Sequence, residues 1–221
     1  MNTQAGYRAA APSGGGQLAW LLRRFARNKA AVVGLVVVAA FALIAVFAPL
    51  IAPYDPIKTD WGMIRKAPSA AHWFGTDELG RDVLSRVIYG ARASLMAGVI
   101  SVFIAFVVGV PLGILSGYIG GIFDTLMMRV IDAFLAIPFL ILAIALAAFL
   151  GPSLTNAMIA IGISTAPVFA RLARGQTLVI KVEEYVEAAY SLGVRPATVL
   201  LRYIFVNAFP PLLVQSTLAI A

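Results

Sequence analysis

Long blocks of apolar residues constrain this chain more than any other feature. Hydrophobic residues make up 61% of the sequence and charged residues 12%, against about half and about a quarter in soluble domains. A hydrocarbon core about 30 Å thick needs roughly 20 apolar residues of helix. Four blocks meet this need and carry a single charge, Asp132, among them: 30–52, 93–115, 130–150 and 153–170. The sequence therefore predicts an all-α polytopic membrane protein and excludes soluble folds.

A fifth apolar block begins at Tyr203 and is still running at Ala221. A spanning helix that starts near Val206 would be cut short there, at the edge of what can cross a bilayer. We therefore expect a fragment that lacks its C-terminal part, with four complete transmembrane helices and a truncated fifth.

The charge distribution argues for an orientation and against nucleic acid. The net charge is +7, but the basic residues flank the apolar spans instead of forming a patch with aromatic residues. Positive charge next to spans marks the cytoplasmic side. The basic run at 23–29 precedes the first span, so we expect 1–29 to be a cytoplasmic tail, flexible over its first twenty residues. The chain has no cysteine, which excludes a disulfide framework and thiolate metal ligands.

Small residues and prolines within the spans predict close packing and bends. Three glycines repeat every four positions, a spacing that lets helices approach closely: Gly109, Gly113 and Gly117. Prolines are expected to interrupt three helices, either as simple kinks or as pivots for opening a pathway: Pro111, Pro138 and Pro167. Arg129 and Asp132 are three residues apart on one helix, which favours a mutual ion pair over a substrate contact.

The segment 53–92 is predicted to lie outside and to contain an amphipathic helix at the membrane surface. Thr76 is placed to cap it, and Asp77 and Glu78 suit the positive end of its dipole. Its apolar face would consist of Leu79, Val83, Leu84, Val87 and Ile88. His72, the one histidine, is interpreted as structural, and no metal-ligand or catalytic constellation is seen.

The internal loop 171–205 predicts a short helix, a glycine turn and a second short helix that leads into the fifth span. Apolar residues recur at helical spacing: Val182, Tyr185, Val186 and Ala189. Gly193 suits a left-handed C-cap, and Pro196 can begin the next helix. The small side chains of Ala188 and Ala189 favour shallow insertion into a groove of another protein. The alternative is an amphipathic helix on the inner leaflet.

These residues carry a resemblance to a known family. Glu187-Ala188-Ala189, followed by Gly193, resembles the EAA loop (176–205 here) of ATP-binding-cassette (ABC) importer permeases. A second motif resembles a segment of the dipeptide and oligopeptide permease C-type subunits: Gly75, Thr76, Asp77, Gly80, Arg81, Asp82, Ser85 and Arg86. Gly120, Gly121 and Asp124 fit the same pattern. The similarity covers roughly 20–221, but the stretch 203–207 lacks the proline usual in the family.

The resemblance implies a type I ABC importer permease fold with a first transmembrane helix at 30–52, a periplasmic segment at 53–92 and a core permease domain at 93–221. It implies a bacterial inner-membrane complex of two permeases, two ATPase subunits and an external solute-binding protein. ATP and Mg would bind the ATPase, since this chain has no phosphate-binding loop. The residues expected to contact the ATPase are Tyr185, Glu187, Ala188, Ala189, Gly193 and Arg195.

Peptides are the expected substrate, with nickel, opines, glutathione and sugars as alternatives for the same machinery. An ion-driven secondary transporter is the competing class. It should show inverted repeats and ionisable residues at the bilayer midplane, and neither is evident in this sequence.

Overall fold

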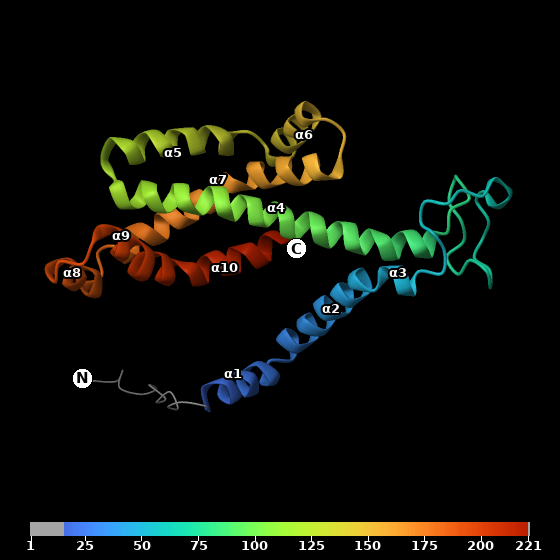
Figure 1. Ribbon diagram of the computed structural model, residues 1–221, viewed down its shortest axis with the longest axis horizontal. Coiled ribbons are helices and arrows are strands. Elements are labelled where there is room, and N and C mark those ends of the chain that lie inside the picture. The colour runs from blue at the N-terminus through green and yellow to red at the C-terminus, as the bar shows by residue number, and fades with distance from the viewer. Residues whose placement is uncertain (1–15, 221) are drawn as a thin grey trace, which may run out of the picture. The chain divides into compact units, whose positions relative to one another are not determined.

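The structure is a computed structural model that describes residues 16–220. The chain forms two compact units, Met1–Arg92 and Ala93–Ala221, and each is described by itself. Within the described residues all regular elements are helices (Figure 1), apart from an isolated bridge between Thr76 and Asp82. The predicted all-α class is therefore confirmed.

The first unit begins with two helices separated by a cap. Helix α1 (Gly16–Arg27) precedes α2 (Lys29–Val46), and the side chain of Asn28 caps α2 by accepting a hydrogen bond from the Ala31 N–H at 3.3 Å. Residues 16–20 were expected in a flexible tail and are instead helical. The rest of that predicted tail, 1–15, lies outside the described residues.

The first apolar block is divided near its end. Only Ala45 of α2 is buried, so almost the whole surface of this helix is apolar and unpartnered within its own unit, as a lipid-facing span requires. The helix stops at Phe47, and α3 (Ala48–Ile51) follows with Pro49 in its first turn. Proline lacks an N–H and clashes with the preceding turn, which explains the break.

Helix α4 (Val83–Ile119) corrects the predicted surface helix. Residues 75–82 form a loop that contains Thr76, and the helix begins only at Val83. Its first turns then continue without a break into the second span, so Thr76 does not cap it. Within residues 53–82 the helical element is the short 3₁₀ helix η1 (Trp61–Met63).

The third apolar block is bent. Helices α5 (Gly121–Ala136) and α6 (Phe139–Leu150) meet at an angle of 93°. The expected single helix over 130–150 is therefore wrong, and Pro138 is confirmed as an interruption. Pro111 and Pro167 instead lie inside the continuous helices α4 and α7 (Leu154–Ile180). Four described helical segments are long and apolar enough to span, or five if the bent pair is one span.

The chain then turns through several short elements. These are α8 (Glu184–Ser191), α9 (Pro196–Thr198), the π-helix η2 (Val199–Phe205) and α10 (Val206–Ile220). The predicted short helix, glycine turn and second short helix are confirmed. Helix α7 runs further into the expected internal loop than predicted, to Ile180, and the final helical run starts at Pro196 instead of Tyr203.

Helix α7 is the centre of the second unit, where it contacts α5, α6 and α10. It also packs closely on α4. A Cβ at Gly109 would lie 2.3 Å from the Ala166 carbonyl oxygen, and one at Gly113 would lie 2.1 Å from that of Ala170. Both helices advance by four residues between these contacts, so they run parallel. The predicted close approach at the glycines is confirmed.

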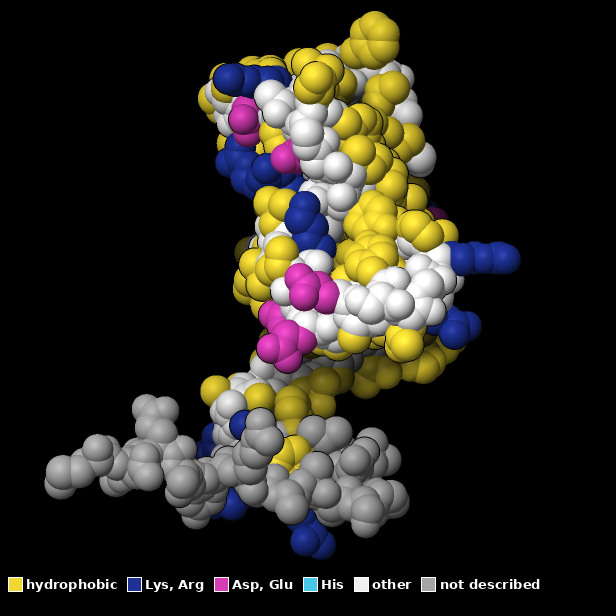
Figure 2. All heavy atoms as spheres, turned by 90° about the vertical axis from the view of Figure 1, so that its left-hand side faces the viewer, with side chains coloured by type: hydrophobic (Ala, Val, Ile, Leu, Met, Phe, Trp, Pro, Cys, Tyr) yellow, Lys and Arg dark blue, Asp and Glu magenta, His cyan; other side chains and the backbone are white. Residues whose placement is uncertain are grey.

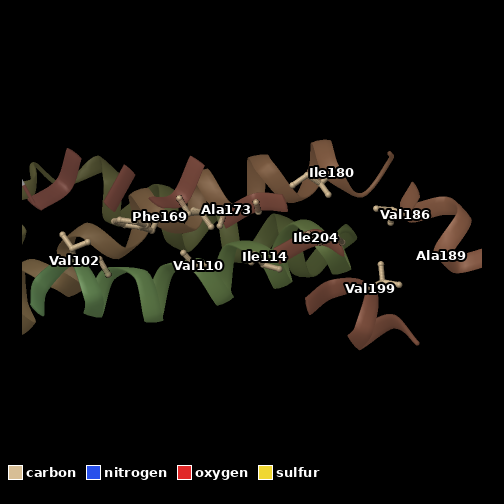
Figure 3. Close-up of a cluster of buried hydrophobic side chains, with 13 residues drawn as sticks. Val102, Val110, Ile114, Phe169, Ala173, Ile180, Val186, Ala189, Val199 and Ile204 are labelled. Carbon is tan, nitrogen blue, oxygen red and sulfur yellow. The ribbon is translucent and has the colours of Figure 1, made fainter. Parts of the chain in front are cut away.

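A single hydrophobic cluster continues from these spans to the short helices (Figure 3). Val102, Val110 and Phe169 belong to its spanning part. Val186 and Ala189 of α8, with Val199 and Ile204 of η2, form its other end. The π-helical repeat of i to i+5 places Val199 and Ile204 on the same side, and both are fully buried.

Candidate functional sites

The α8 segment, defined here as residues 183–196, has a well-formed turn at its centre. The Val194 N–H donates to the Ala189 carbonyl at 3.1 Å, and the Gly193 N–H donates to that of Tyr190 at 2.9 Å. These two bonds form a Schellman motif, which needs a left-handed residue after the helix. Gly193 has φ +74°, so the C-cap predicted from the sequence is confirmed.

Buried contacts hold α8 against its own unit. Val186 and Ala189 lie in the hydrophobic cluster. The Tyr190 hydroxyl donates to that of Tyr118 on α4 at 2.9 Å. Burial and this bond to Tyr118 raise the pKa of Tyr190 to about 12, so the hydroxyl stays protonated at neutral pH. The helix is therefore fixed to the spans at defined points.

The opposite side of α8 is open. Tyr185, Glu187 and Ala188 are exposed, and Figure 2 shows acidic side chains beside apolar ones on the face of the second unit that is turned to the viewer. Gly193 and Arg195 are exposed as well. Ala189 is only 3% exposed, so of the six residues carried over from the family it alone faces inward.

Sequence reasoning missed Leu192, which is 83% exposed. The apolar pattern that predicts the helix extends to Ala189 and does not include Leu192. Leu192 is the residue at which α8 ends, however, and the turn there directs its side chain outward. No sequence signal would have identified it.

A polar cluster ties the helices together near α8. Asp124 of α5 accepts two hydrogen bonds from the Arg174 guanidinium of α7, both at 2.6 Å, and one from the Ser116 hydroxyl at 2.5 Å. The Lys181 ammonium, just after α7, donates to the Gly117 carbonyl at 2.8 Å. Three helices are thus fixed to one another next to the point where α8 begins.

The predicted ion pair between Arg129 and Asp132 is wrong. Asp132 of α5 pairs with Arg171 of α7, with 2.5 Å between the carboxylate oxygen and the guanidinium nitrogen. Asp132 pairs with a residue on a neighbouring helix instead of one on its own helix, because α5 packs on α7. The pair therefore connects two spans.

The residues of the second motif, 75–86, hold their own loop together. The carboxylate of Asp77 accepts hydrogen bonds from the Leu79 and Arg81 N–H groups at 2.8 and 3.0 Å, and from the Arg81 guanidinium at 2.8 Å; Arg86 also donates to it. Desolvation would raise the pKa of Asp77, but these bonds outweigh it and lower the pKa to about 2.

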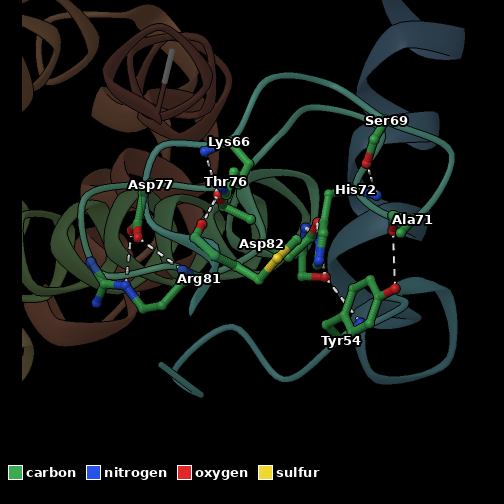
Figure 4. A network of polar contacts seen from close by, with 11 residues as sticks. Tyr54, Lys66, Ser69, Ala71, His72, Thr76, Asp77, Arg81 and Asp82 are labelled. Atoms are coloured by element: carbon green, nitrogen blue, oxygen red, sulfur yellow. Dashed lines mark hydrogen bonds and ion pairs between the residues drawn. The ribbon is translucent and has the colours of Figure 1, made fainter. Parts of the chain in front are cut away.

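Asp82 joins the loop to the start of α4. It caps the helix by accepting from the Ser85 N–H at 2.8 Å and the Ser85 hydroxyl at 2.7 Å, and it bonds the His72 ring at 2.9 Å (Figure 4). The His72 ring also stacks near Tyr54, with centroids 4.7 Å apart. Desolvation opposes ionisation of Asp82, but the bonds from Ser85 and His72 lower its pKa. His72 therefore has the structural role predicted for it.

Two glycines and a threonine complete the loop. Gly75 and Gly80 have φ +71° and +72°, and a Cβ at Gly80 would lie 1.8 Å from the Asp60 carbonyl oxygen. The Thr76 hydroxyl accepts from the Lys66 N–H at 2.9 Å and donates to the Met63 carbonyl. Each residue of the motif thus contributes to local structure. No group of three or more potential metal ligands occurs within 16–220.

Comparison with known proteins decides the family. Residues 109–221 match the family model described as binding-protein-dependent transport system inner membrane component. Residues 16–68 match the N-terminal TM domain of oligopeptide transport permease C. The chain belongs to the binding-protein-dependent inner membrane components.

Relatives of this inner membrane component cover most of the chain. It is 42% identical over 89% of its length to the dipeptide transport system permease protein of Alkalihalophilus pseudofirmus, spanning 64% of that protein. It is 45% identical over 93% of its length to a "Probable D,D-dipeptide transport system permease protein" of Escherichia coli strain K12, spanning 68% of it. A glutathione transport system permease protein of Shigella dysenteriae is 44% identical over 90% of the chain, which spans 66% of that protein. The chain thus spans about two thirds of the length of these relatives.

Membership of the family places the chain among multi-pass membrane proteins, in agreement with its four or five apolar segments. Its relatives are named as permease proteins and not as enzymes. The inner membrane component therefore has two distinct regions of interest, the α8 segment and the motif loop before α4.

Proposed function

We propose that this chain is a permease subunit of an ABC importer for peptides, and that α8 couples it to a separate ATPase. The observation that carries the proposal is the two-sided construction of α8. Val186 and Ala189 fix one side in the hydrophobic cluster, and Glu187, Ala188 and Leu192 face outward.

The outward side has the chemistry of a docking surface. Ala188 has a side chain short enough to let a groove of another protein approach the helix backbone. Leu192 supplies an apolar anchor, and the exposed Tyr185, Glu187 and Arg195 supply a polar rim. An apolar centre with a polar rim is the usual anatomy of a protein interface.

The chain path explains how a force on α8 would reach the spans. Helix α7 leads into α8, and α9 and η2 lead from it into α10, which contacts α7. A displacement of α8 by the ATPase therefore moves two neighbouring membrane helices together. The Asp124–Arg174 bonds extend this coupled body to α5.

The resemblance to ABC importer permeases supplies the remaining partners of the proposal. ATP and Mg bind the two ATPase subunits, while a second homologous permease completes the pathway and an external solute-binding protein delivers the substrate. Counting α5 and α6 as one span gives four crossings before α8, which supports a location of α8 on the same side of the membrane as the N-terminus. The basic residues before α2 favour the cytoplasm as that side.

The names of the relatives favour a peptide substrate, since two are dipeptide systems and one transports glutathione. Glutathione is itself a small peptide, so it remains within the proposed class. Nickel, opines and sugars are the alternatives within the same machinery. Purification of the associated solute-binding protein with its bound solute distinguishes them.

The test uses the tagged, full-length protein, expressed in its native host and purified from the membrane in mild detergent. We expect an ATPase and a second permease to co-purify, with ATP hydrolysis inhibited by vanadate. Glu187→Ala and Ala188→Trp, both at exposed positions of α8, should reduce recovery of the ATPase without lowering the amount of the permease in the membrane. Glu78→Ala is the matched control, because Glu78 forms only an exposed ion pair with Arg65.

Normal uptake and normal ATPase recovery in both α8 variants would contradict the assignment. Uptake that persists after ATP depletion but collapses with an uncoupler would instead favour a secondary transporter.

A further inference from the structure

An open cavity, whose wall is mostly apolar, lies among the helices of the second unit. Its volume is about 440 Å³, and it is lined from α5, α7 and α10. Leu135, Val168 and Leu172 are among its apolar lining residues, whereas Arg171, Gln176 and Gln215 are polar. Three polar side chains from two membrane helices thus converge on one space.

The charges at this cavity argue against a lipid-facing position. Arg171 pairs with Asp132, yet their side chains remain 56% and 54% exposed. Polar and charged groups are costly in hydrocarbon and are found facing a bundle interior or a water-filled space. The exposed residues of α2, by contrast, are apolar along its length after Lys29. The two surfaces therefore suit different environments.

The cavity also lies between the two helices that the α8 segment connects. Gln176 is four residues before the end of α7 at Ile180, which is about one helical turn. Gln215 is on α10, the next span after α8. A movement of α8 would therefore change the width of this cavity directly.

We propose that this cavity forms part of the wall of the translocation pathway, with Gln176 and Gln215 facing the passing substrate. The inference rests on the proposed function. Each glutamine amide can donate and accept hydrogen bonds, so it can replace water at the N–H and C=O groups of a peptide. Because the amides are neutral, they form these hydrogen bonds without a strong electrostatic attraction that would retain the substrate.

The absence of native cysteine allows a clean test with single-cysteine variants. Gln176→Cys and Gln215→Cys are made in the full-length chain, and the complete complex is reconstituted in lipid nanodiscs. Val214→Cys is the control, since Val214 adjoins Gln215 on α10 and is 58% exposed but does not line the cavity. The probe is a charged, water-soluble methanethiosulfonate reagent, which reacts with the thiolate form.

We expect both glutamine-site thiols to react at least tenfold faster than the one at 214. Rates equal to that of the control at both positions would overturn the inference. Addition of ATP and vanadate should change the two fast rates several-fold. If both thiols react fast but vanadate does not change their rates, the cavity is accessible to water, yet its accessibility does not respond to the ATPase. That result would support the pathway proposal and contradict the proposed coupling. The two proposals can therefore be tested separately.

Discussion

The motif loop and the α8 segment both carry a sequence resemblance to one family, but they use their residues in opposite ways. In the loop, Asp77 and Asp82 accept hydrogen bonds from their own chain. In the α8 segment, Glu187 and Leu192 point outward. A family motif can therefore mark residues that hold a structure together or residues that are kept available for another protein.

The difference gives the two regions separate experimental signatures. Variants of the motif residues that hold the loop together should reduce the amount or the stability of the protein. Variants on the open side of α8 should leave both unchanged and reduce transport.

The largest effect is expected for Gly80→Ala in the loop. The new Cβ would lie 1.8 Å from the Asp60 carbonyl oxygen at a backbone φ of +72°, and strain of this kind costs about 1–3 kcal/mol even before the clash. The yield of folded protein in the membrane should fall severalfold, as measured by fluorescence-detected size exclusion. Gly90→Ala is the control, since a Cβ there meets nothing within 4 Å. Equal yields for the two variants would show that the loop is not required for stability.

Leu192→Asp should abolish coupling while leaving the fold intact. The side chain is 83% exposed, so its replacement removes no internal contact, but a charge at an apolar anchor weakens docking. A loss of more than about 1.4 kcal/mol of binding corresponds to a tenfold weaker interaction, and ATP-driven uptake should fall by at least that factor. Leu192→Met, which keeps an apolar side chain at this position, should retain normal uptake. A fall in membrane yield instead of uptake would place Leu192 with the structural residues.

A smaller effect is expected for Tyr190→Phe. Tyr190 belongs to the α8 segment, but its hydroxyl has a structural role. The change removes the hydrogen bond to the Tyr118 hydroxyl, a contact worth about 0.5–1.5 kcal/mol. Thermal unfolding in detergent should shift down by a few degrees. Tyr203→Phe, whose ring packs on the same hydrophobic cluster, is the matched control and should be stable. An unchanged melting temperature for Tyr190→Phe would mean that burial alone fixes α8.

The smallest effect is a dependence of loop stability on pH. The pKa of Asp77 is lowered from 3.8 to about 2, so its contribution is fully present above pH 4 and is lost as the pH falls toward 2. Melting temperature should thus be flat from pH 5 to 8 with respect to this group and should decline below pH 4. Asp77→Asn should show a weaker decline. A decline of the same size in that variant would assign the acid sensitivity to other carboxylates.

Periodic and local features were predictable from the sequence. The spans follow from apolar length, a close helix approach from Gly109 and Gly113, and the turn after α8 from Gly193. Each depends on residues close together in the chain or on one repeating pattern.

Features that depend on tertiary contacts were not predictable. Asp132 pairs with Arg171 across 39 residues, and no local pattern indicates that choice. Thr76 has the chemistry of a helix cap, but its hydroxyl is used by Lys66 and Met63, so the helix begins later. The π-helix η2 occurs where Val199 and Ile204 are both buried in the cluster. The α-helical period of 3.6 residues does not predict that these two residues share one side.

The most direct test of the account compares two adjacent alanines of α8. Ala188 is exposed and Ala189 is buried, and the chain has no native cysteine. Ala188→Cys and Ala189→Cys in the complete complex are treated with a bifunctional thiol cross-linker, and linkage to the ATPase subunit is measured. The account predicts strong linkage from position 188 and little from 189. Absence of linkage from 188, or equal linkage from both, would contradict the claim that the open side of α8 is the coupling surface.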